Sequence, residues 1–194
     1  EIRRMFVPAE GCVLVDADYS QIELRLLAHI SGDENMRAAF ASGADIHTAT
    51  AAQVFHVAPE EVTPEMRRSA KAVNFGIVYG ISAFSLSQDI GVSVAEAKAY
   101  MEAYFATFPG VRRYMDQVVE GARESGYVET MFHRRRELPE LKSSNFNLRS
   151  FGERVALNMP IQGTAADIMK LAMIAVWRRL RTEQPQARLV LQVH

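Results

Sequence analysis

A repeat of two cations and two aromatic rings at four-residue intervals is the feature of this sequence that most constrains its fold. The repeat consists of Arg67, Lys71, Phe75 and Tyr79. Residues four apart lie on one face of an α-helix, so these side chains form a stripe roughly 18 Å long. Thr63 followed by Pro64 is a typical helix start, and Gly80 is a typical stop. The pattern therefore predicts a helix over about residues 64–79.

The stripe also predicts a ligand. Arg67 and Lys71 fall in the first turns of the predicted helix, where the positive end of the helix dipole disfavours cations. An anion lying across that end would be bound by free backbone N–H groups and by both side chains. Because the other end of the stripe is flat and aromatic, the pattern favours a phosphate chain that carries a base, which is a nucleotide.

The alternative interpretation is an ordinary amphipathic helix, with the two aromatic rings in a core and the two cations in solvent. Val73, Ile77 and Val78 already give the predicted helix a separate apolar face. This second face favours the nucleotide interpretation, and the spacing alone leaves both open.

The composition limits the class of protein. A chain of 194 residues that is 48% hydrophobic can bury a core of one domain or two small ones. A net charge of −1 gives no overall basic surface, so contacts with nucleic acid must come from local patches. The single Cys12 excludes an internal disulfide, and the sequence has no signal peptide or membrane-spanning apolar run. We therefore expect a cytoplasmic protein that makes no membrane contact.

The order of the patterns predicts an α+β chain that is predominantly helical. We expect a strand at 12–18, a helix at 22–30, helices through most of 45–124, a hairpin at 127–138, a helix at 147–181 and a strand at 189–194. Pro160 is expected to bend or interrupt the long helix. The two terminal strands are expected to pair in one small sheet, with the helical block as an insertion. The sequence stops inside the last strand, so we expect a piece of a longer protein.

Two carboxylates follow the first predicted strand. Asp18 stands at the end of that strand, and Glu23 follows five residues later. Nucleotidyl transfer needs hard oxygen ligands for Mg²⁺, and Asp18 is well placed to be one. Asp16 lies two residues earlier on the same strand face. It is either a second ligand or a solvated neighbour.

A further group at four-residue spacing lies in the long helix. Arg154, Asn158 and Gln162 share one helix face. Minor-groove edges offer similar acceptors for every base pair, so amide donors placed there can check pairing geometry without reading sequence. The alternative is that the two amides bond backbone groups freed by Pro160.

Taken in order, these segments closely resemble the family A DNA polymerases of the bacterial DNA polymerase I type. DYSQIELR resembles that family's motif A, RRSAKAVNFGIVYG its motif B, and QVH the opening of its motif C, which continues with two acidic residues. The phrases GYVET, RSFGERVALN and PIQGTAADIMKLAM are also similar to the family. The resemblance covers essentially the whole chain.

The resemblance implies a right-hand polymerase and a division of this chain into three parts. Residues 1–43 would form part of the palm with the motif A strand and helix, and residues 44–124 the helical fingers. Residues 125–194 would form the hairpin and the return to the palm, including the long helix and a truncated motif C strand.

The resemblance also implies the catalytic chemistry. Asp18 and the carbonyl group of Tyr19 would bind the two catalytic Mg²⁺ ions, and Lys71 would donate a proton to the departing pyrophosphate. Glu23, assisted by Tyr79, would be the steric gate that excludes a ribose 2′-hydroxyl. The nucleotide-binding residues would be Gln21, Glu23, His47, Arg67, Lys71, Phe75 and Tyr79. The residues in contact with primer and template would be Arg154, Asn158, Gln162 and His194.

The implied activity is template-dependent addition of dNTPs to a primer 3′-OH, with primer–template DNA and dNTPs as partners. We expect the complete enzyme to be a monomer. Because the motif C carboxylates are absent from this sequence, we expect the chain alone to be inactive. Two alternatives remain from the sequence, a non-catalytic nucleotide- or DNA-binding homologue and a structural helical domain.

Overall fold

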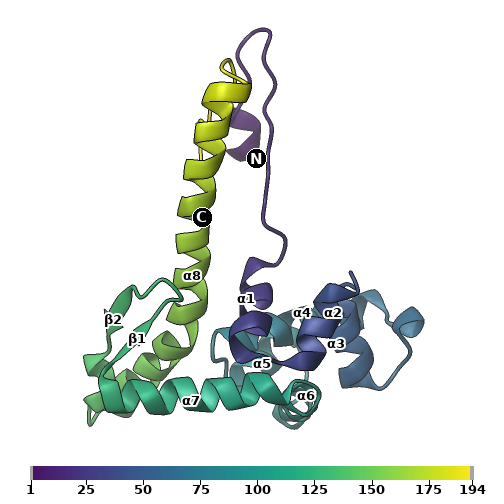
Figure 1. The fold of residues 1–194 in the computed structure, drawn as a ribbon. Coiled ribbons are helices and arrows are strands. Elements are labelled where there is room, and N and C mark those ends of the chain that lie inside the picture. The colour runs from purple at the N-terminus through teal and green to yellow at the C-terminus, as the bar shows by residue number, and fades with distance from the viewer. Residues whose placement is uncertain (1, 193–194) are drawn as a thin grey trace.

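The computed structural model describes residues 2–192 as a set of helices with one short antiparallel hairpin (Figure 1). The α-helices are α1 (Ile22–Ser31), α2 (Glu34–Ala41), α3 (Ile46–Phe55), α4 (Pro64–Val78), α5 (Ala83–Ile90), α6 (Val94–Thr107), α7 (Pro109–Ser125) and α8 (Phe146–Glu183). The strands are β1 (Tyr127–Glu129) and β2 (Arg135–Glu137). Short 3₁₀ helices lie at Ile2–Met5, Pro59–Glu61 and Pro139–Lys142. The predominantly helical α+β prediction is confirmed at this level.

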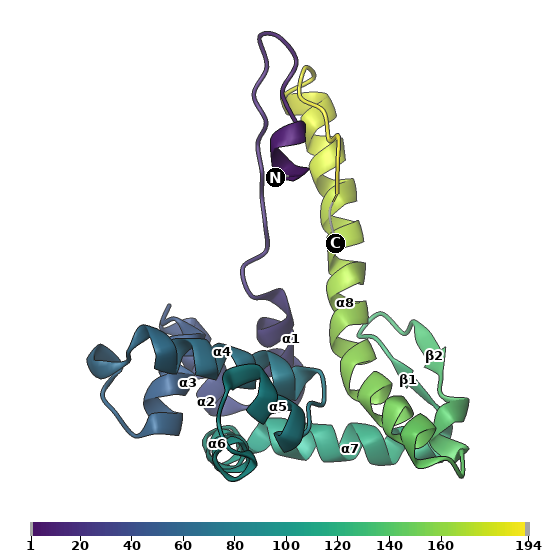
Figure 2. The same cartoon turned by 180° about the vertical axis from the view of Figure 1, so that it is seen from behind.

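The helices form two groups that α7 connects. In Figures 1 and 2, α7 runs along the base, with the block α1–α6 near one end and the hairpin near the other. The long helix α8 rises from the hairpin end, and the segment before α1 extends towards the upper end of α8. Within residues 2–192, no helix is both long and apolar enough to cross a lipid bilayer.

Local sequence signals set most helix boundaries. The side chains that cap helix starts by accepting backbone N–H bonds are Asp33, Asp45, Thr63, Ser82, Ser93 and Asn145. Such caps satisfy N–H groups that have no partner inside the helix. Thr63 accepts from the N–H of Met66 at 3.2 Å, and Pro64 occupies the first turn of α4. The predicted helix over 64–79 is confirmed, with Tyr79 as its C-terminal cap.

Apolar packing decides which way α4 faces. Val73, Ile77 and Val78 are buried in a cluster to which each helix from α1 to α8 contributes. A second, smaller cluster joins α7, the hairpin and α8. With its apolar face in the first cluster, α4 holds Phe75 half-buried and leaves Tyr79 37% exposed. The interpretation that both rings lie in a core is therefore wrong.

The predicted terminal strands need correction. Residues 12–18 are extended but carry no strand assignment, and Val13 and Val15 are 81% and 87% exposed. Residues 189–192 also lack a strand, and residues 193–194 lie outside the described part. A strand requires hydrogen bonds to a neighbouring strand, and β1 and β2 are the only paired strands in residues 2–192. The predicted pairing of 12–18 with 189–194 is not found there.

The long helix continues through Pro160 without interruption. Its assignment runs over 38 residues from Phe146 to Glu183, and its lower part bends towards the hairpin (Figures 1 and 2). Proline removes one helical N–H donor and crowds the preceding turn. The hydroxyl of Thr164 donates to the Pro160 carbonyl at 2.5 Å, a side-chain bond that often accompanies helix bending. The prediction of a bend is supported, and that of an interruption is wrong.

The buried carboxylate of Asp33 connects two helix starts. Its Oδ1 accepts from the N–H of Met36 in α2 at 2.9 Å, and its Oδ2 accepts from the N–H of Gly110 in α7 at 2.7 Å. Asp33 is only 3% exposed. A Cβ atom on Gly110 would lie 2.8 Å from the Asp33 Cα, so this approach requires glycine. The contact fixes α7 against the block α1–α6.

We expect Asp33→Ala to lower the free energy of unfolding by about 2–4 kcal/mol, because two buried N–H groups lose a charged acceptor. Asp33→Asn should cost less, since the amide oxygen can still cap α2. Denaturant unfolding measures both, with the exposed Glu120→Ala in α7 as control. A loss below about 0.5 kcal/mol for Asp33→Ala would contradict this role.

Candidate functional site

A cavity of about 500 Å³ brings together residues from three separate parts of the chain. It lies among the segment before α1, the first turn of α1, the C-terminal half of α4 and the middle of α8. Seven of the residues singled out in the sequence line it, namely Asp18, Tyr19, Gln21, Glu23, Phe75, Tyr79 and Gln162. The aromatic end of the stripe and the predicted carboxylates thus share one cavity.

A hydrogen bond spans this cavity from α4 to α1. The hydroxyl of Tyr79 donates to Oε2 of Glu23 at 2.8 Å. Burial and the nearby Glu23 carboxylate raise the pKa of Tyr79. The phenol therefore stays protonated at neutral pH and continues to donate. The bond holds the Glu23 carboxylate beside the aromatic end of the stripe.

Gln21 and Asp18 lie just before the first residue of α1. Gln21 has a left-handed backbone with φ 56°, which is uncommon for a residue with a Cβ atom. Non-glycine residues in this conformation concentrate at functional sites. Asp18 and Asp16 are both exposed. Within residues 2–192, no group of three or more His, Cys, Asp or Glu side chains is placed to hold a metal ion.

The cationic end of the stripe contacts the start of α3. The Nε atom of Arg67 donates to Oδ2 of Asp45 at 2.6 Å. The same carboxylate caps α3 through the N–H groups of His47 and Thr48. Burial alone would raise the pKa of Asp45, but hydrogen bonds from Arg67 and Thr48 hold it well below its usual value. Lys71 is exposed one turn further along the same helix face.

His47 lies between the cations and a buried polar cluster. Its Nδ1 atom is 3.2 Å from the side-chain amide nitrogen of Asn74, which also donates to the Thr50 hydroxyl at 3.0 Å. Asn74 and Thr50 are fully buried. The His47 ring centre is 5.8 Å from that of Phe75. The cluster therefore supports the His47 ring against the stripe.

Burial lowers the pKa of His47, and the positive charges of Arg67 and Lys71 lower it further, against the opposing effect of Asp45. His47 is thus neutral at physiological pH. Because the unfolded state binds a proton more readily, this site contributes stability above about pH 6.5. That contribution is lost as the pH falls through the folded pKa.

Two of the residues singled out on α8 line different cavities beside α4. Gln162 reaches the cavity described above, whereas Arg154 lines a neighbouring cavity of about 590 Å³ with Phe75, Tyr79 and residues of α5. The amide nitrogen of Asn158 donates to Oε1 of Gln162 at 3.1 Å, rather than to freed backbone. The buried Oδ1 of Asn158 has no hydrogen-bond partner among the described residues. His194 lies outside the described residues.

A third cavity differs in its chemistry. It measures about 600 Å³ between α2, α3 and α6, and alanines make up much of its lining. None of the residues singled out in the sequence lines it, whereas both cavities beside α4 are lined by Phe75 and Tyr79. The cavities beside α4 are therefore the better candidates for a nucleotide.

Comparison with known proteins identifies the chain. The family model described as DNA polymerase family A matches residues 1–194. The chain belongs to DNA polymerase family A. It is 59% identical to DNA polymerase I of Geobacillus stearothermophilus over 195 aligned residues, which cover all of this chain and 22% of that protein. It is 58% identical to DNA polymerase I of Bacillus subtilis, with the same coverage. The chain thus spans about a fifth of the length of these relatives.

A solved structure agrees with this membership of family A. The structure titled "POL domain of Pol1 from M. smegmatis complex with DNA primer-template and dNTP" matches with a TM-score of 0.86 and 50% sequence identity. The match covers 90% of this chain and 31% of that one. The resemblance drawn from the three motifs is therefore confirmed. Family A DNA polymerases use divalent metal ions.

Two residues of this candidate site were not singled out in the sequence. Asp45 precedes α3 and carries an N-cap signal, which gives no indication of its contact with Arg67. Asn74 stands on the buried face of α4 with Ala70, Val73 and Ile77. A polar residue in such a face is the one available signal for a buried hydrogen-bonded cluster.

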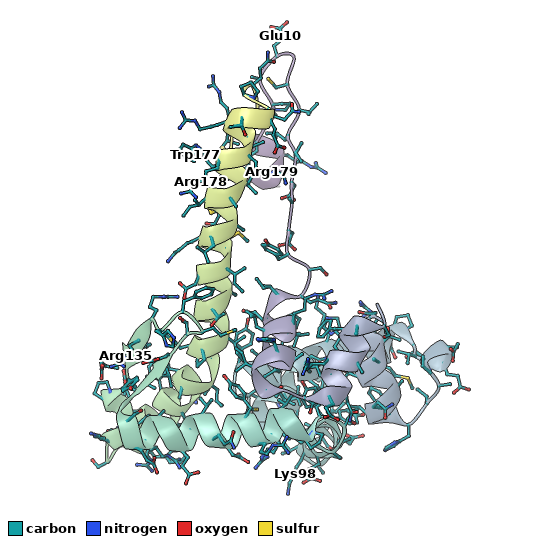
Figure 3. All side chains as sticks on the ribbon, viewed as in Figure 1. Glu10, Lys98, Arg135, Trp177, Arg178 and Arg179 are labelled. Atoms are coloured by element: carbon teal, nitrogen blue, oxygen red, sulfur yellow. The ribbon has the colours of Figure 1, made fainter. Side chains whose placement is uncertain are left out.

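NMR titration of labelled histidine side chains tests the electrostatics of this site. We expect the His47 midpoint to lie below 6.5, and Lys71→Met to raise it, because one repelling cation is removed. The matched control is Lys98→Met, since Lys98 projects from α6 at the lower edge of the molecule (Figure 3). A His47 midpoint at or above 6.5 in the unaltered protein would contradict the described surroundings.

Proposed function

We propose that the protein containing this chain is a DNA-directed DNA polymerase, and that this chain supplies its dNTP-binding surface. The reaction adds dNTPs to a primer 3′-OH on a DNA template. The observation that carries the proposal is the shared cavity of Asp18, Glu23, Phe75, Tyr79 and Gln162. Membership of family A and the relatives named DNA polymerase I support it.

The arrangement of α4 suits a nucleotide triphosphate. Arg67 and Lys71 are both exposed on α4, one turn apart, and their positive charges favour an anion. Phe75 and Tyr79 continue the same face, so a base can stack where the triphosphate ends. In this proposal Lys71 also protonates the departing pyrophosphate. Neutral His47 and Gln21 complete the pocket.

These residues would supply only part of a Mg²⁺ site. The Asp18 carboxylate and the Tyr19 carbonyl are hard oxygen donors of the kind Mg²⁺ prefers. Asp18 lines the cavity and is exposed, which fits one ligand. Two bound Mg²⁺ ions would stabilise charge on the attacking and leaving oxygens. Residues 2–192 offer no complete ligand set, so we propose that Asp18 acts with carboxylates from elsewhere in the protein.

The remaining proposals concern contacts with DNA and the roles of the parts of the chain. Arg154, Asn158, Gln162 and His194 would contact primer and template near the new base pair. In this proposal residues 44–124 act as fingers and the flanking parts contribute to the palm. We propose that the complete enzyme is a cytoplasmic monomer and that this chain alone lacks activity.

We expect Asp18→Ala to abolish primer extension by the full-length polymerase, with less than a tenth of the normal rate remaining, because a metal ligand is lost. Primer–template binding should survive. Asp16→Ala is the matched control, since Asp16 is exposed on the same segment but does not line the cavity. Full extension by Asp18→Ala would favour the alternative that this chain only binds nucleotide or DNA.

Sugar selection gives a separate test. We propose that Glu23, held by Tyr79 at 2.8 Å, blocks a ribose 2′-hydroxyl. Glu23→Ala should raise ribonucleotide incorporation relative to dNTP incorporation by about tenfold or more, because trimming an obstacle removes steric exclusion. Tyr79→Phe should raise it less, since Glu23 remains. The exposed Glu65→Ala in the first turn of α4 is the control, and an unchanged ratio for Glu23→Ala would contradict the gate.

A further inference from the structure

Asp45 is held in one orientation by the start of α3. Its Oδ1 accepts from the N–H of His47 at 3.4 Å, and its Oδ2 accepts from the N–H and hydroxyl of Thr48 at 3.3 and 2.7 Å. A carboxylate with this many local donors loses little freedom when it accepts one more bond. Asp45 is therefore a fixed acceptor at the edge of the cationic end of α4.

Arg67 meets this acceptor with one edge of its guanidinium. The Nε–H donates to Oδ2 of Asp45 at 2.6 Å, and this is the one hydrogen bond that the structure gives the Arg67 side chain within residues 2–192. A guanidinium has five N–H donors in a planar fork, so four donors on the two Nη atoms remain for another partner. Those donors suit a phosphate group bound in a bidentate manner.

The ion pair with Asp45 also offsets the repulsion between two neighbouring cations. Arg67 and Lys71 lie one turn apart on the same face of α4 and repel each other. The Arg67 side chain is 47% exposed, so without a partner it would sample many rotamers in water. Ordering such a side chain on binding costs conformational entropy. The contact with Asp45 lowers that cost before a nucleotide arrives.

We infer that Asp45 is a positioning residue for nucleotide binding, which holds Arg67 by its Nε edge so that the Nη atoms face the triphosphate. This inference rests on the proposed function. Asp45 does not contact the nucleotide in this arrangement and acts through Arg67 alone. A substitution of Asp45 should therefore change the affinity for dNTPs and leave the maximal rate of chemistry nearly unchanged.

Asp45→Ser is the informative variant, because serine is as good a helix cap as aspartate but is too short to reach Arg67. In single-turnover primer extension by the full-length polymerase, we expect about three- to tenfold weaker apparent dNTP affinity and a maximal rate within about twofold of normal. Asp45→Asn should recover part of the affinity, since its amide oxygen can still accept from Nε. Thr48→Val, which frees the Asp45 carboxylate from one donor, should weaken affinity slightly and serves as a second variant if Asp45→Ser is unstable.

A double-mutant cycle decides whether Asp45 acts through Arg67. In an Arg67→Ala background, Asp45→Ser should have no further effect on dNTP affinity. The inference would be overturned if Asp45→Ser had an equal effect in both backgrounds or left dNTP affinity unchanged. Tighter dNTP binding by Asp45→Ser would also overturn it, and would mean that Asp45 competes with the triphosphate. If Arg67→Ala itself leaves dNTP affinity unchanged, the proposed triphosphate role of Arg67 fails, and this result is distinct from the others.

Discussion

The two-faced packing of α4 is the constraint on which the candidate site depends. Val73, Ile77 and Val78 are buried against the surrounding helices, and this burial fixes the rotation of α4 about its own axis. The face away from Val73 and Ile77 then presents two cations and two aromatic rings along one line. Burying three such side chains contributes several kcal/mol, at about 25 cal/mol per Å² of apolar surface. The direction of the stripe is thus set by the core rather than by any ligand.

Each end of the stripe is held by a carboxylate from another helix region. Asp45 at the start of α3 accepts from Arg67, and Glu23 in the first turn of α1 accepts from Tyr79. The two carboxylates therefore restrict the rotamers of a cation and a ring that are both partly exposed. A pre-ordered surface loses less conformational entropy when a ligand binds. This ordering explains how short helices can present a defined binding face.

The parts of the fold that the sequence predicts are those determined by local signals. Helix α4 follows from the Thr63 cap, Pro64 and the four-residue spacing, and the hairpin follows from its alternating pattern. The strands expected at 12–18 and in the described part of 189–194 are not found, because the apolar run 12–18 favours extended backbone while strand formation depends on a distant partner. The roles of Asp45 and Asn74 were missed for the same reason, since both arise from how α3 packs on α4.

Photochemical labelling tests the central claim that the outward face of α4 binds the base of an incoming nucleotide. The full-length polymerase with primer–template would be irradiated with an azido-purine dNTP and the labelled peptides sequenced. We expect adducts within residues 71–80, on the face of Phe75 and Tyr79, and we expect unmodified dNTP to suppress them. Adducts concentrated at the alanine-lined cavity between α2, α3 and α6, with none on α4, would contradict it.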